Sequence, residues 1–542
     1  MKKEKEYEFW IDEIARKIVE KYPKEKTIHL NGGLSIRGPQ HIGRFRTEIV
    51  IQASVKKIIE EKYKRKVIQY LTLYDMDGQK IKGIKNGFPN DKEKQEKYVG
   101  VSLFNIPDPF GCCKNWQEHF WKDFGGHFKD FGLDIKIVKT SEFYKMPETK
   151  KIVKWMLENR KKVVKLVNKF RSRNPWPEDY IPINPICEKC LSINDTEATG
   201  FDLDKYTVDY VCNKCGHEGT TSLENAKLNW RLEWIAIWKV LDIEFEPYGK
   251  DHAAAGGSRE TCGIFSKELL NREPPYGIWC EWVSLKMKGK NLGQMTASGF
   301  VGITPKQWLE IADPEILKYL YIGTRPHTAM TIDLDKIPNY YDDYYKAEKV
   351  YFGKEKLSTE REEHNIKRAF ELSQVASIKK PKIQLNYEFL SQITQIIKGE
   401  NKTERVIKLL KKLKILDHDP DKYEKERIEK LLNYTNNWIK EYASDNFRIE
   451  FLETVPENII SQLSKEQKEA LKKFAEYIKE ERTDEELVKE MKKITQKINL
   501  KPEKFFKAAY LVLFGKPHGP RLVPLIQSLD RDFVVKRFLL ES

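Results

Sequence analysis

Two pairs of cysteines are the residues whose spacing most clearly suits chemistry. CEKC occupies residues 187–190 and CNKC occupies residues 212–215. Two cysteines separated by two residues can lie on one tight turn, and four thiolates from two such turns can surround one Zn²⁺ tetrahedrally. The pattern predicts a zinc ribbon, whose metal is usually structural, and the alternative is two unrelated reduced pairs. The expected metal ligands are Cys187, Cys190, Cys212 and Cys215.

The stretch GPQHIGR, residues 38–44, is the second candidate. It lies between an apolar strand-like stretch at 27–32 and an amphipathic run that begins at Phe45. Open α/β sheets bind ligands in such loops, because helix N–H groups and the crevice beyond the strand ends meet there. The position predicts a nucleotide site around His41, Gly43 and Arg44. A polar surface turn with a permissive glycine is the alternative.

Two later stretches carry similar polar groups. FEPYGKDHAAAGGS (245–258) reads as a strand that ends at Asp251 and His252, followed by small residues that let a ligand approach the backbone. LKMKGKNLGQMTASG (285–299) reads as a flexible, donor-rich loop suited to triphosphate, or else as a solvated basic turn. The polar and basic residues of this second stretch are Lys286, Lys288, Lys290, Gln294, Thr296 and Ser298, with Met295 among them.

The elements around these residues predict a parallel sheet. Residues 27–74 read strand, loop, helix (45–62) and strand (67–74), which is one βαβ unit. Short apolar runs at 133–140, 243–249 and 277–283 read as later strands of the same sheet, with a helix at 151–170. We therefore expect an α/β, Rossmann-type domain over residues 1–345, with the zinc ribbon inserted at 183–222.

The character of the chain changes from about residue 350. Polar helical segments dominate, and capping boxes are expected at Ser464–Gln467 and Thr483–Glu486. An apolar stripe at helical spacing is expected to face a core; its residues are Leu487, Met491, Ile494 and Ile498. The pattern predicts an all-α region over residues 346–542.

Composition narrows the class of partner. The 542 residues carry 97 basic and 82 acidic side chains, a net charge of +15, which favours a polyanion such as nucleic acid. No apolar run approaches the roughly 18 residues of a membrane span, and the N-terminus has no apolar core of a secretory signal. The remaining cysteines, Cys112, Cys113, Cys262 and Cys280, are scattered, which suits a reducing compartment. We expect a cytoplasmic protein.

These segments together resemble the class I aminoacyl-tRNA synthetases, and within them the class I lysyl-tRNA synthetases of the archaeal type. His41-Ile42-Gly43-Arg44 matches the HIGH signature, and Gln294-Met295-Thr296-Ala297-Ser298 stands in the place of KMSKS. The resemblance runs almost end to end and in the family's order. Its further landmarks are IPDPFGCC (106–113) with EHF (118–120), KLNWRLEW (227–234), GKDHAAAGGS (249–258), YLYIGTRP (319–326) and GKPHGPRLVPLI (515–526).

The resemblance implies a two-step reaction on lysine, ATP with Mg²⁺, and tRNA. The lysine carboxylate attacks the α-phosphate of ATP, and a terminal ribose hydroxyl of tRNA then attacks the activated carbonyl. It implies ATP contacts from His41, Gly43, Asp251, His252 and the 294–298 segment, and an anticodon-binding role for the helical region. Lysine-pocket positions that it implies are Gly33, Ser35, Trp230, His252 and Glu281; Asp75 and Asp77, at the end of the second strand, are additional candidates.

The chain departs from the family pattern at three places. Arg44 replaces the usual Asn or His, Cys280 replaces an aromatic residue, and the late signature lacks both of its lysines. We therefore expect Lys286, Lys288 or Lys290, together with Arg44, to neutralise the pyrophosphate.

Three other functions remain open from the sequence. A class I synthetase for glutamate would pair Arg37 or Arg44 with a carboxylate side chain. A silent tRNA-binding relative would keep the basic helical region and the zinc ribbon. A DNA-binding zinc protein would leave the βαβ unit and the ligand loops unexplained. We expect no membrane and no DNA partner.

Overall fold

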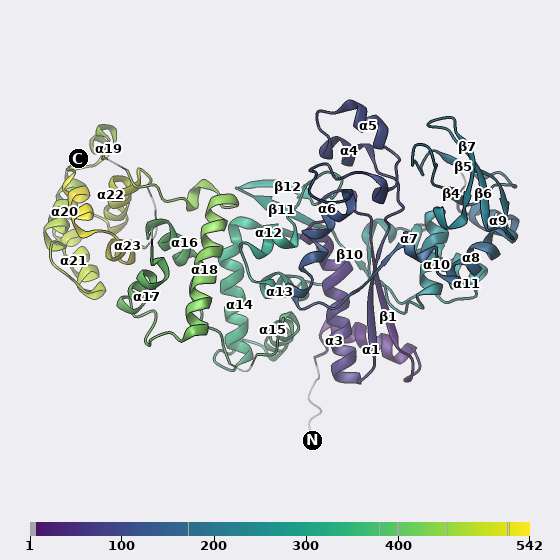
Figure 1. The fold of residues 1–542 in the computed structure, drawn as a ribbon. Helices are drawn as coiled ribbons and strands as arrows, with labels where there is room; N and C mark the ends of the chain where they lie inside the picture. Colours follow the sequence, from purple (N-terminus) through teal and green to yellow (C-terminus); the bar gives the residue numbers. More distant parts are fainter. Residues whose placement is uncertain are drawn as a thin grey trace, which may run out of the picture. The chain divides into compact units, whose positions relative to one another are not determined.

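The structure is a computed structural model that describes residues 7–171, 173–378, 380–397, 400–452, 454–517, 519 and 521–541 (Figure 1). The described residues form two compact units. The first takes in Met1–Lys286, Lys290–Asp333 and Asp343–Pro381, and the second takes in Met287–Gly289, Leu334–Asp342 and Lys382–Ser542. His518 and Pro520, which belong to the landmark at 515–526, lie outside the described residues.

A parallel sheet is the centre of the first unit. Strand β1 (Ile28–Leu34) pairs with β2 (Val67–Leu73), and β2 pairs with β3 (Lys136–Lys139), all in parallel. On the other side of β1, Leu30 bridges Phe245, and Phe245 bridges Tyr276, leading into the parallel pair β9 (Tyr248–Gly249) and β10 (Trp279–Cys280). The predicted βαβ unit is confirmed, and the run at 133–140 supplies β3 of the same sheet. The runs at 243–249 and 277–283 instead form the separate short pair β9–β10, which only the single bridges at Phe245 connect to β1.

Helices cover this sheet, and two of them differ from the prediction. The segment expected as one helix at 151–170 is two helices, α8 (Pro147–Glu158) and α9 (Arg160–Asn168). Asn159 leaves the helical region with φ −99° and ψ 21°, and its side-chain amide donates to the Trp155 carbonyl at 2.8 Å. The other helices before residue 275 are α1 (Trp10–Lys21), α2 (Ile42–Phe45), α3 (Ile51–Tyr63), α4 (Ile81–Gly87), α5 (Lys92–Tyr98), α6 (Trp116–Lys122), α7 (Thr140–Phe143), α10 (Trp230–Val240) and α11 (Ser258–Leu270).

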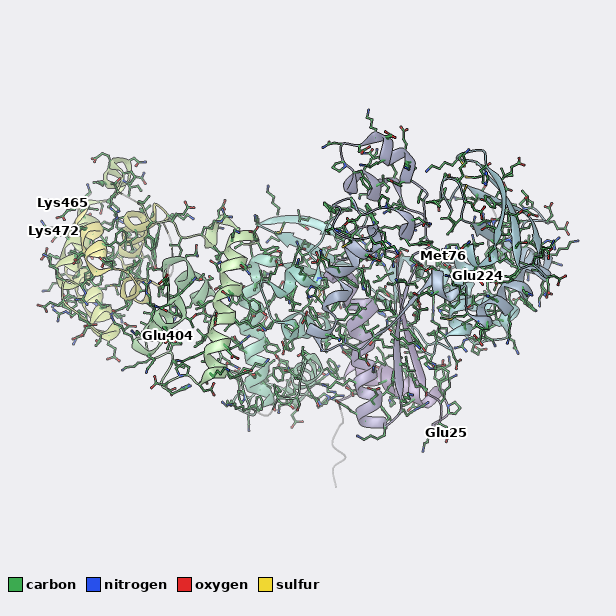
Figure 2. The ribbon with its side chains drawn as sticks, viewed as in Figure 1. Glu25, Met76, Glu224, Glu404, Lys465 and Lys472 are labelled. Carbon is green, nitrogen blue, oxygen red and sulfur yellow. The ribbon has the colours of Figure 1, made fainter. Side chains whose placement is uncertain are left out.

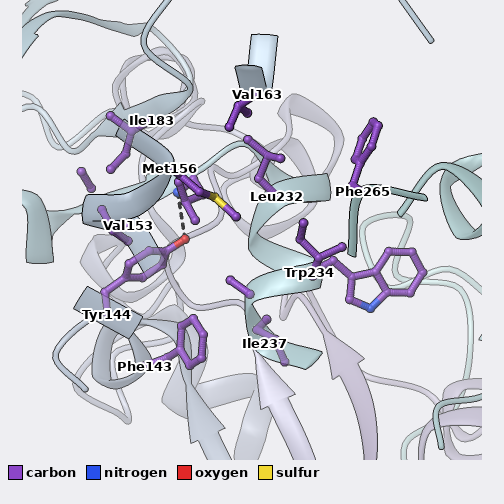
Figure 3. Close-up of a cluster of buried hydrophobic side chains, with 14 of the residues drawn as sticks. Phe143, Tyr144, Val153, Met156, Val163, Ile183, Leu232, Trp234, Ile237 and Phe265 are labelled. Carbon is purple, nitrogen blue, oxygen red and sulfur yellow. Dashed lines mark hydrogen bonds between the residues drawn. The ribbon is translucent and has the colours of Figure 1, made fainter. Parts of the chain in front are cut away.

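The largest apolar core near the inserted segment lies between the sheet and α8–α11. Figure 3 shows Val153 and Met156 of α8, Val163 of α9 and Leu232 of α10 turned toward one another, and all four side chains are fully buried. The Tyr144 hydroxyl accepts a hydrogen bond from the Leu228 N–H at 2.8 Å and donates to Glu233, so this core also holds a satisfied polar group. Packing in this core holds α10 in place, and Trp230 is the first residue of α10.

The inserted segment is a small antiparallel module. Strands β5 (Thr196–Asp202), β6 (Thr207–Cys212) and β7 (Glu218–Ser222) form its sheet. At its base β4 (Ile183–Pro185) pairs with β8 (Ala226–Leu228), so the chain enters and leaves the module along one two-stranded ladder.

The segment expected as a flexible loop at 285–299 is mostly a β-hairpin. Strand β11 (Val283–Met287) is followed by Lys288 and Gly289, with φ of 50° and 73°, and by β12 (Lys290–Gln294). Two left-handed residues between two strands form the tight turn whose twist matches an antiparallel ladder. Only residues 295–302 make a loop. Strand β13 (Met330–Asp333) pairs with β11, and α12 (Pro305–Leu309), α13 (Pro314–Gly323), α14 (Ile337–Tyr351) and α15 (Glu360–Ser373) follow the hairpin.

From residue 382 the described chain is helical and contains no strand. The capping boxes predicted at Ser464–Gln467 and Thr483–Glu486 are present, and Leu487, Met491 and Ile494 are buried. Lys465 and Lys472 of α20 are exposed (Figure 2). The helices are α16 (Tyr387–Ile396), α17 (Lys402–Lys412), α18 (Lys422–Glu441), α19 (Glu457–Gln462), α20 (Lys465–Tyr477), α21 (Asp484–Lys497), α22 (Pro502–Phe514), α23 (Leu522–Ser528) and α24 (Arg531–Leu539).

The predicted domain division at residue 345 falls inside α14, the helix whose residues the two units share. In the described part of the chain, no helix is both long enough and apolar enough to cross a membrane.

Candidate functional site

The candidate site lies where the order of the parallel strands reverses. The chain runs from β1 outward to β2 and β3, and then returns to the opposite side of β1 at Phe245. Loops that leave neighbouring strands in opposite directions open a crevice at their carboxyl ends, which is where such sheets bind ligands. The 35–41 segment follows β1 and the 250–257 segment follows β9, so both leave the carboxyl ends of strands on either side of this reversal.

His41 occupies the N-cap position of α2 and is buried, with 6% of its surface exposed. Burial, and secondarily the positive charge of Arg44, lowers the pKa of His41 to about 3. The imidazole is therefore neutral at physiological pH and can act as a hydrogen-bond donor but not as a cation. Its Nδ1 atom has no hydrogen-bond partner among the described residues. Arg44, one turn further on, is exposed.

The late signature segment packs directly on the His41 loop. A Cβ at Gly38 would lie 2.3 Å from the Ala297 carbonyl oxygen, and a Cβ at Gly302 would lie 2.5 Å from the His41 Cβ. The backbone of residue 42 is held by its N–H to the Ile303 carbonyl at 2.8 Å. The structure thus brings residues 295–302 and His41 together, although some 250 residues of sequence separate them. Both glycines are needed for this close approach.

The three lysines expected to serve this segment lie on the hairpin. Lys286 on β11 forms an ion pair with Asp333 at 2.9 Å. Lys288 is in the turn and Lys290 opens β12, and both are exposed. Because a strand rises about 3.3 Å per residue, Lys290 starts roughly 13 Å along β12 from Gln294. The structure therefore does not place these lysines beside residues 295–298.

Glu48 is a candidate site residue that the sequence analysis did not single out. It lies in a π-helical turn (Arg46–Val50) between α2 and α3, a distortion frequently found at functional sites. Its Oε2 atom accepts a hydrogen bond from the Gly33 N–H at 3.0 Å, so its carboxylate reaches the end of β1. Burial raises the pKa of Glu48 to about 7, and Arg44 and the Gly33 N–H only partly offset that effect. Among the described residues Glu48 forms no ion pair, although the positive charge of Arg44 acts on it.

Aromatic rings gather where α10 begins, next to His252. Trp230 is 42% exposed, which rules out its interpretation as an ordinary core aromatic. It stacks on Trp234 with ring centroids 5.4 Å apart, and the His252 ring lies 5.7 Å from Trp230 and 5.5 Å from Trp234. The indole N–H groups of Trp234 and Trp238 donate to the buried Glu246.

The remaining predicted pocket residues already have partners within the chain. Asp77 accepts from Ser35 and forms ion pairs with Arg37 at 3.0 Å and with the buried Lys227 at 2.5 Å. Asp75 accepts hydrogen bonds from the Thr140 hydroxyl and the Ser141 N–H, both at 2.8 Å. These two carboxylates orient the ends of β2 and β8.

Glu281 follows β10 and forms an ion pair with Lys250 at 2.6 Å. The hydrogen bond from Lys250 keeps the pKa of Glu281 below its usual value. Lys250 also lies 4.0 Å from the centre of the Trp282 ring. Asp251 is exposed, and its carboxylate lies 3.6 Å from the His252 Nε2 atom.

The four predicted zinc ligands converge at one point. Their Sγ atoms all lie within 4.8 Å of one another; Cys187 and Cys215 are 3.7 Å apart, and Cys190 and Cys212 are 3.5 Å apart. Tetrahedral zinc with Zn–S bonds of about 2.3 Å needs sulfurs about 3.8 Å apart. Each knuckle closes in the same way. The Leu191 N–H donates to the Cys187 carbonyl oxygen and the Gly216 N–H donates to the Cys212 carbonyl oxygen, and both Leu191 and Gly216 have a left-handed φ.

A second group of metal-type side chains lies on the segment 108–119. One ligand atom each from Asp108, Cys112, Cys113 and His119 lies within 4.8 Å of the others. The His119 Nδ1 atom is 3.1 Å from Asp108 and 3.2 Å from the Cys112 sulfur. The sequence analysis identified residues 106–113 and 118–120 as family landmarks but did not predict a metal site there. Adjacent cysteines lack the regular spacing of a zinc knuckle. The chain turns back here because Asp108 accepts the N–H groups of Cys112 and Cys113, both at 2.7 Å.

Two family models match the chain. The model described as "tRNA synthetases class I (K)" matches residues 8–376, and the model described as "Anticodon binding domain" matches residues 365–539. The first model alone matches more than half of the chain, so the predicted family resemblance is confirmed.

Curated relatives match almost end to end. A lysine–tRNA ligase of Aeropyrum pernix is 37% identical over 97% of this chain and 97% of its own length. A lysine–tRNA ligase of Methanocaldococcus jannaschii is 33% identical over 98% of this chain and 99% of its own length. A third, from Methanococcus maripaludis, is 32% identical over the same shares of both chains.

Proposed function

Because this chain belongs to the class I tRNA synthetases of the lysine type, we propose that it joins lysine to its tRNA through a lysyl-adenylate made from ATP. A lysine carboxylate oxygen bonds to the α-phosphorus of ATP, and pyrophosphate leaves with the electron pair of the broken bond. The ribose hydroxyl of tRNA then attacks the activated carbonyl and releases AMP. Such chemistry needs mainly positioning and neutralisation of charge.

The observation that favours lysine over glutamate is the carboxylate of Glu48, which forms no ion pair among the described residues. A glutamate enzyme would pair Arg37 or Arg44 with the side-chain carboxylate of its substrate, but Arg37 is already paired with Asp77, and the charge of Arg44 acts on Glu48. A lysine enzyme needs an acceptor for an ammonium group, and a partly buried carboxylate without an ion-pair partner can supply it. We propose that Glu48 accepts an ammonium group of lysine, that Trp230 and His252 flank the aliphatic stem, and that Gly33 and Ser35 line the floor.

Amino-acid-dependent exchange of pyrophosphate into ATP tests this function. Across the twenty amino acids, with and without tRNA, exchange should be far fastest with lysine. Exchange driven by glutamate would replace the proposal with its nearest rival, and tRNA binding without exchange for any amino acid would leave a silent relative.

For ATP we propose contacts from the His41 ring, the backbone at Gly43, and the loop that holds Gln294, Met295, Thr296 and Ser298. Asp251 and His252 would meet the ribose and base from the other wall of the crevice. Mg²⁺ enters with ATP as part of the substrate and supplies charge neutralisation on the phosphates. The chain's own part is to hold the neutral His41 imidazole and the late loop against each other.

We propose that each chain holds two zinc ions. The Cys187, Cys190, Cys212 and Cys215 sulfurs have the spacing that tetrahedral Zn²⁺ requires, and the Asp108 group offers the mixed oxygen, nitrogen and sulfur donors that zinc accepts. In both places zinc would hold together a turn of the chain.

Elemental analysis should therefore find two zinc ions per chain. Cys187→Ser should release one, and because zinc affinity is folding free energy in such modules, the inserted module should lose protection from proteolysis. Cys113→Ser should release the other and leave the inserted module protected. Cys262→Ser is the matched control, since Cys262 belongs to neither group. Two ions retained in both variants would contradict the assignment.

For tRNA we propose that the helical residues 382–541 bind the anticodon end through phosphate contacts. The KM for tRNA in lysylation should rise steeply between 50 and 200 mM salt, by roughly 10-fold or more, because each neutralised phosphate releases counterions. Lysine-dependent exchange without tRNA should change far less over the same range. A chain ending at Pro381 keeps α15 with the first unit and should still activate lysine while charging tRNA poorly. A salt-independent KM for tRNA would count against this role.

A further inference from the structure

The late signature lacks its own lysines, and the structure places a lysine from another segment against it. A Cβ built on Gly299 would lie 3.0 Å from the Lys82 Nζ atom and 2.3 Å from the Thr296 hydroxyl. The Lys82 ammonium group and the Thr296 hydroxyl therefore both lie next to Gly299, on the same side of the late loop. Lys82 is the second residue of α4 and belongs to neither signature segment.

The contact between α4 and the late loop is specific. Asn86, four residues after Lys82 and hence on the same face of α4, donates its side-chain amide to the Ser298 carbonyl at 2.9 Å. The other side of α4 rests on the His41 loop, since a Cβ at Gly83 would lie 2.6 Å from the Arg37 carbonyl oxygen. Helix α4 thus contacts both signature loops, and Lys82 is exposed where they meet.

Lys82 is exposed and forms no ion pair among the described residues. The neighbouring Arg37, whose carbonyl oxygen faces Gly83 of α4, is already paired with Asp77 and does not compete with Lys82 for an anion. An exposed ammonium group where two loops meet can bind an anion, and the polyanion that this site would receive is a triphosphate.

We propose that Lys82 is the pyrophosphate-binding cation of adenylate formation and replaces the lysines absent from the late loop. This inference rests on the proposed function and deepens it. When a lysine carboxylate oxygen bonds to the α-phosphorus, the bond from that phosphorus to the bridging oxygen breaks and its electron pair stays on pyrophosphate. The Lys82 ammonium keeps its protons throughout and stabilises the charge that develops on the leaving group.

The test compares Lys82→Ala and Lys82→Met with the parent in pyrophosphate exchange and in single turnover. Either variant should slow adenylate formation by about 10- to 100-fold, as loss of one preorganised charged donor does. Both should raise the inhibition constant of pyrophosphate, and Lys82→Arg should restore much of the rate. Transfer from preformed lysyl-adenylate to tRNA should keep the parent rate, because pyrophosphate has already left. Lys92→Ala, which removes an exposed charge from the next helix, should behave as the parent.

Two results would overturn the inference. One is an unchanged exchange rate in Lys82→Ala and Lys82→Met, and the other is equal slowing of adenylate formation and of transfer to tRNA. Failure of the proposed function itself is distinguishable, because the parent would then show no lysine-dependent exchange.

Discussion

Replacing His41 with alanine should slow lysyl-adenylate formation by about 100- to 1,000-fold, the usual cost of losing one preorganised donor to a developing charge. Lysine affinity, measured by calorimetry without ATP, should change little, because the His41 side chain packs against Gly302 of the late loop, which is proposed to bind ATP. His127→Ala, which removes a histidine that pairs with Asp130 elsewhere, should leave the rate unchanged. An exchange rate for His41→Ala within a few fold of the parent would refute the nucleotide assignment.

The pH dependence gives a second measure of His41. Since burial lowers the pKa of His41 to about 3, the imidazole is neutral across the working range, and the parent should show no loss of activity from its protonation between pH 6 and 9. A cationic histidine that bound phosphate would instead lose activity as pH rises through its pKa. The pH–rate profile of the parent distinguishes the two.

Glu48→Gln should raise the KM for lysine by about 10- to 100-fold at pH 8, since a charged hydrogen bond to an ammonium group contributes roughly 1.5–3 kcal/mol. The KM for ATP should move much less. Glu61→Gln, at an exposed position near the end of α3, is the control. A lysine KM unchanged by Glu48→Gln would remove Glu48 from the pocket.

The raised pKa of Glu48 adds a pH signature. The folded carboxyl ionises near pH 7 while the unfolded one ionises near its ordinary 4.5, so the native state binds the extra proton and loses stability as pH rises from about 4.5 through 7. Bound lysine supplies the missing cation. The rise in melting temperature caused by lysine should therefore be larger at pH 8 than at pH 6, and Glu48→Gln should abolish that difference.

The features that could be predicted from the sequence are those that depend on a local residue pattern. The unit at 27–74 has apolar runs of strand length around an amphipathic helix, and the knuckles at 187–190 and 212–215 carry their metal chemistry in consecutive residues. The break at Asn159 and the hairpin at Lys288–Gly289 were missed although both have local signals: an asparagine inside a helical run, and a Lys-Gly pair between alternating residues. The break at Asn159 was missed because the amphipathic pattern continues on both sides of it. The hairpin was missed because a signature loop was expected at that place.

The other features that the sequence did not reveal depend on contacts that a local residue pattern does not show. Glu48 reaches Gly33 only because a π-helical turn shifts its side chain relative to a regular helix, and a residue pattern at helical spacing does not reveal such a turn. Lys82 meets Gly299 only through the packing of α4, more than 200 residues away in sequence. The Asp108 group depends on a backbone turn that its own carboxylate organises. Each of these contacts is a product of tertiary structure.

The order in which the loops appear along the chain bears on how the protein is made. All four sulfurs of the inserted module have been synthesised once residue 215 has emerged, and β8, which closes the module's base, follows by residue 228. The crevice needs residues 295–302, so its nucleotide-binding walls meet only after the hairpin has been translated. On the ribosome, where N-terminal parts fold first, the proposed zinc site would thus be complete well before the proposed nucleotide site. If the module binds zinc as proposed, a shortage of zinc during translation would act on the nascent chain.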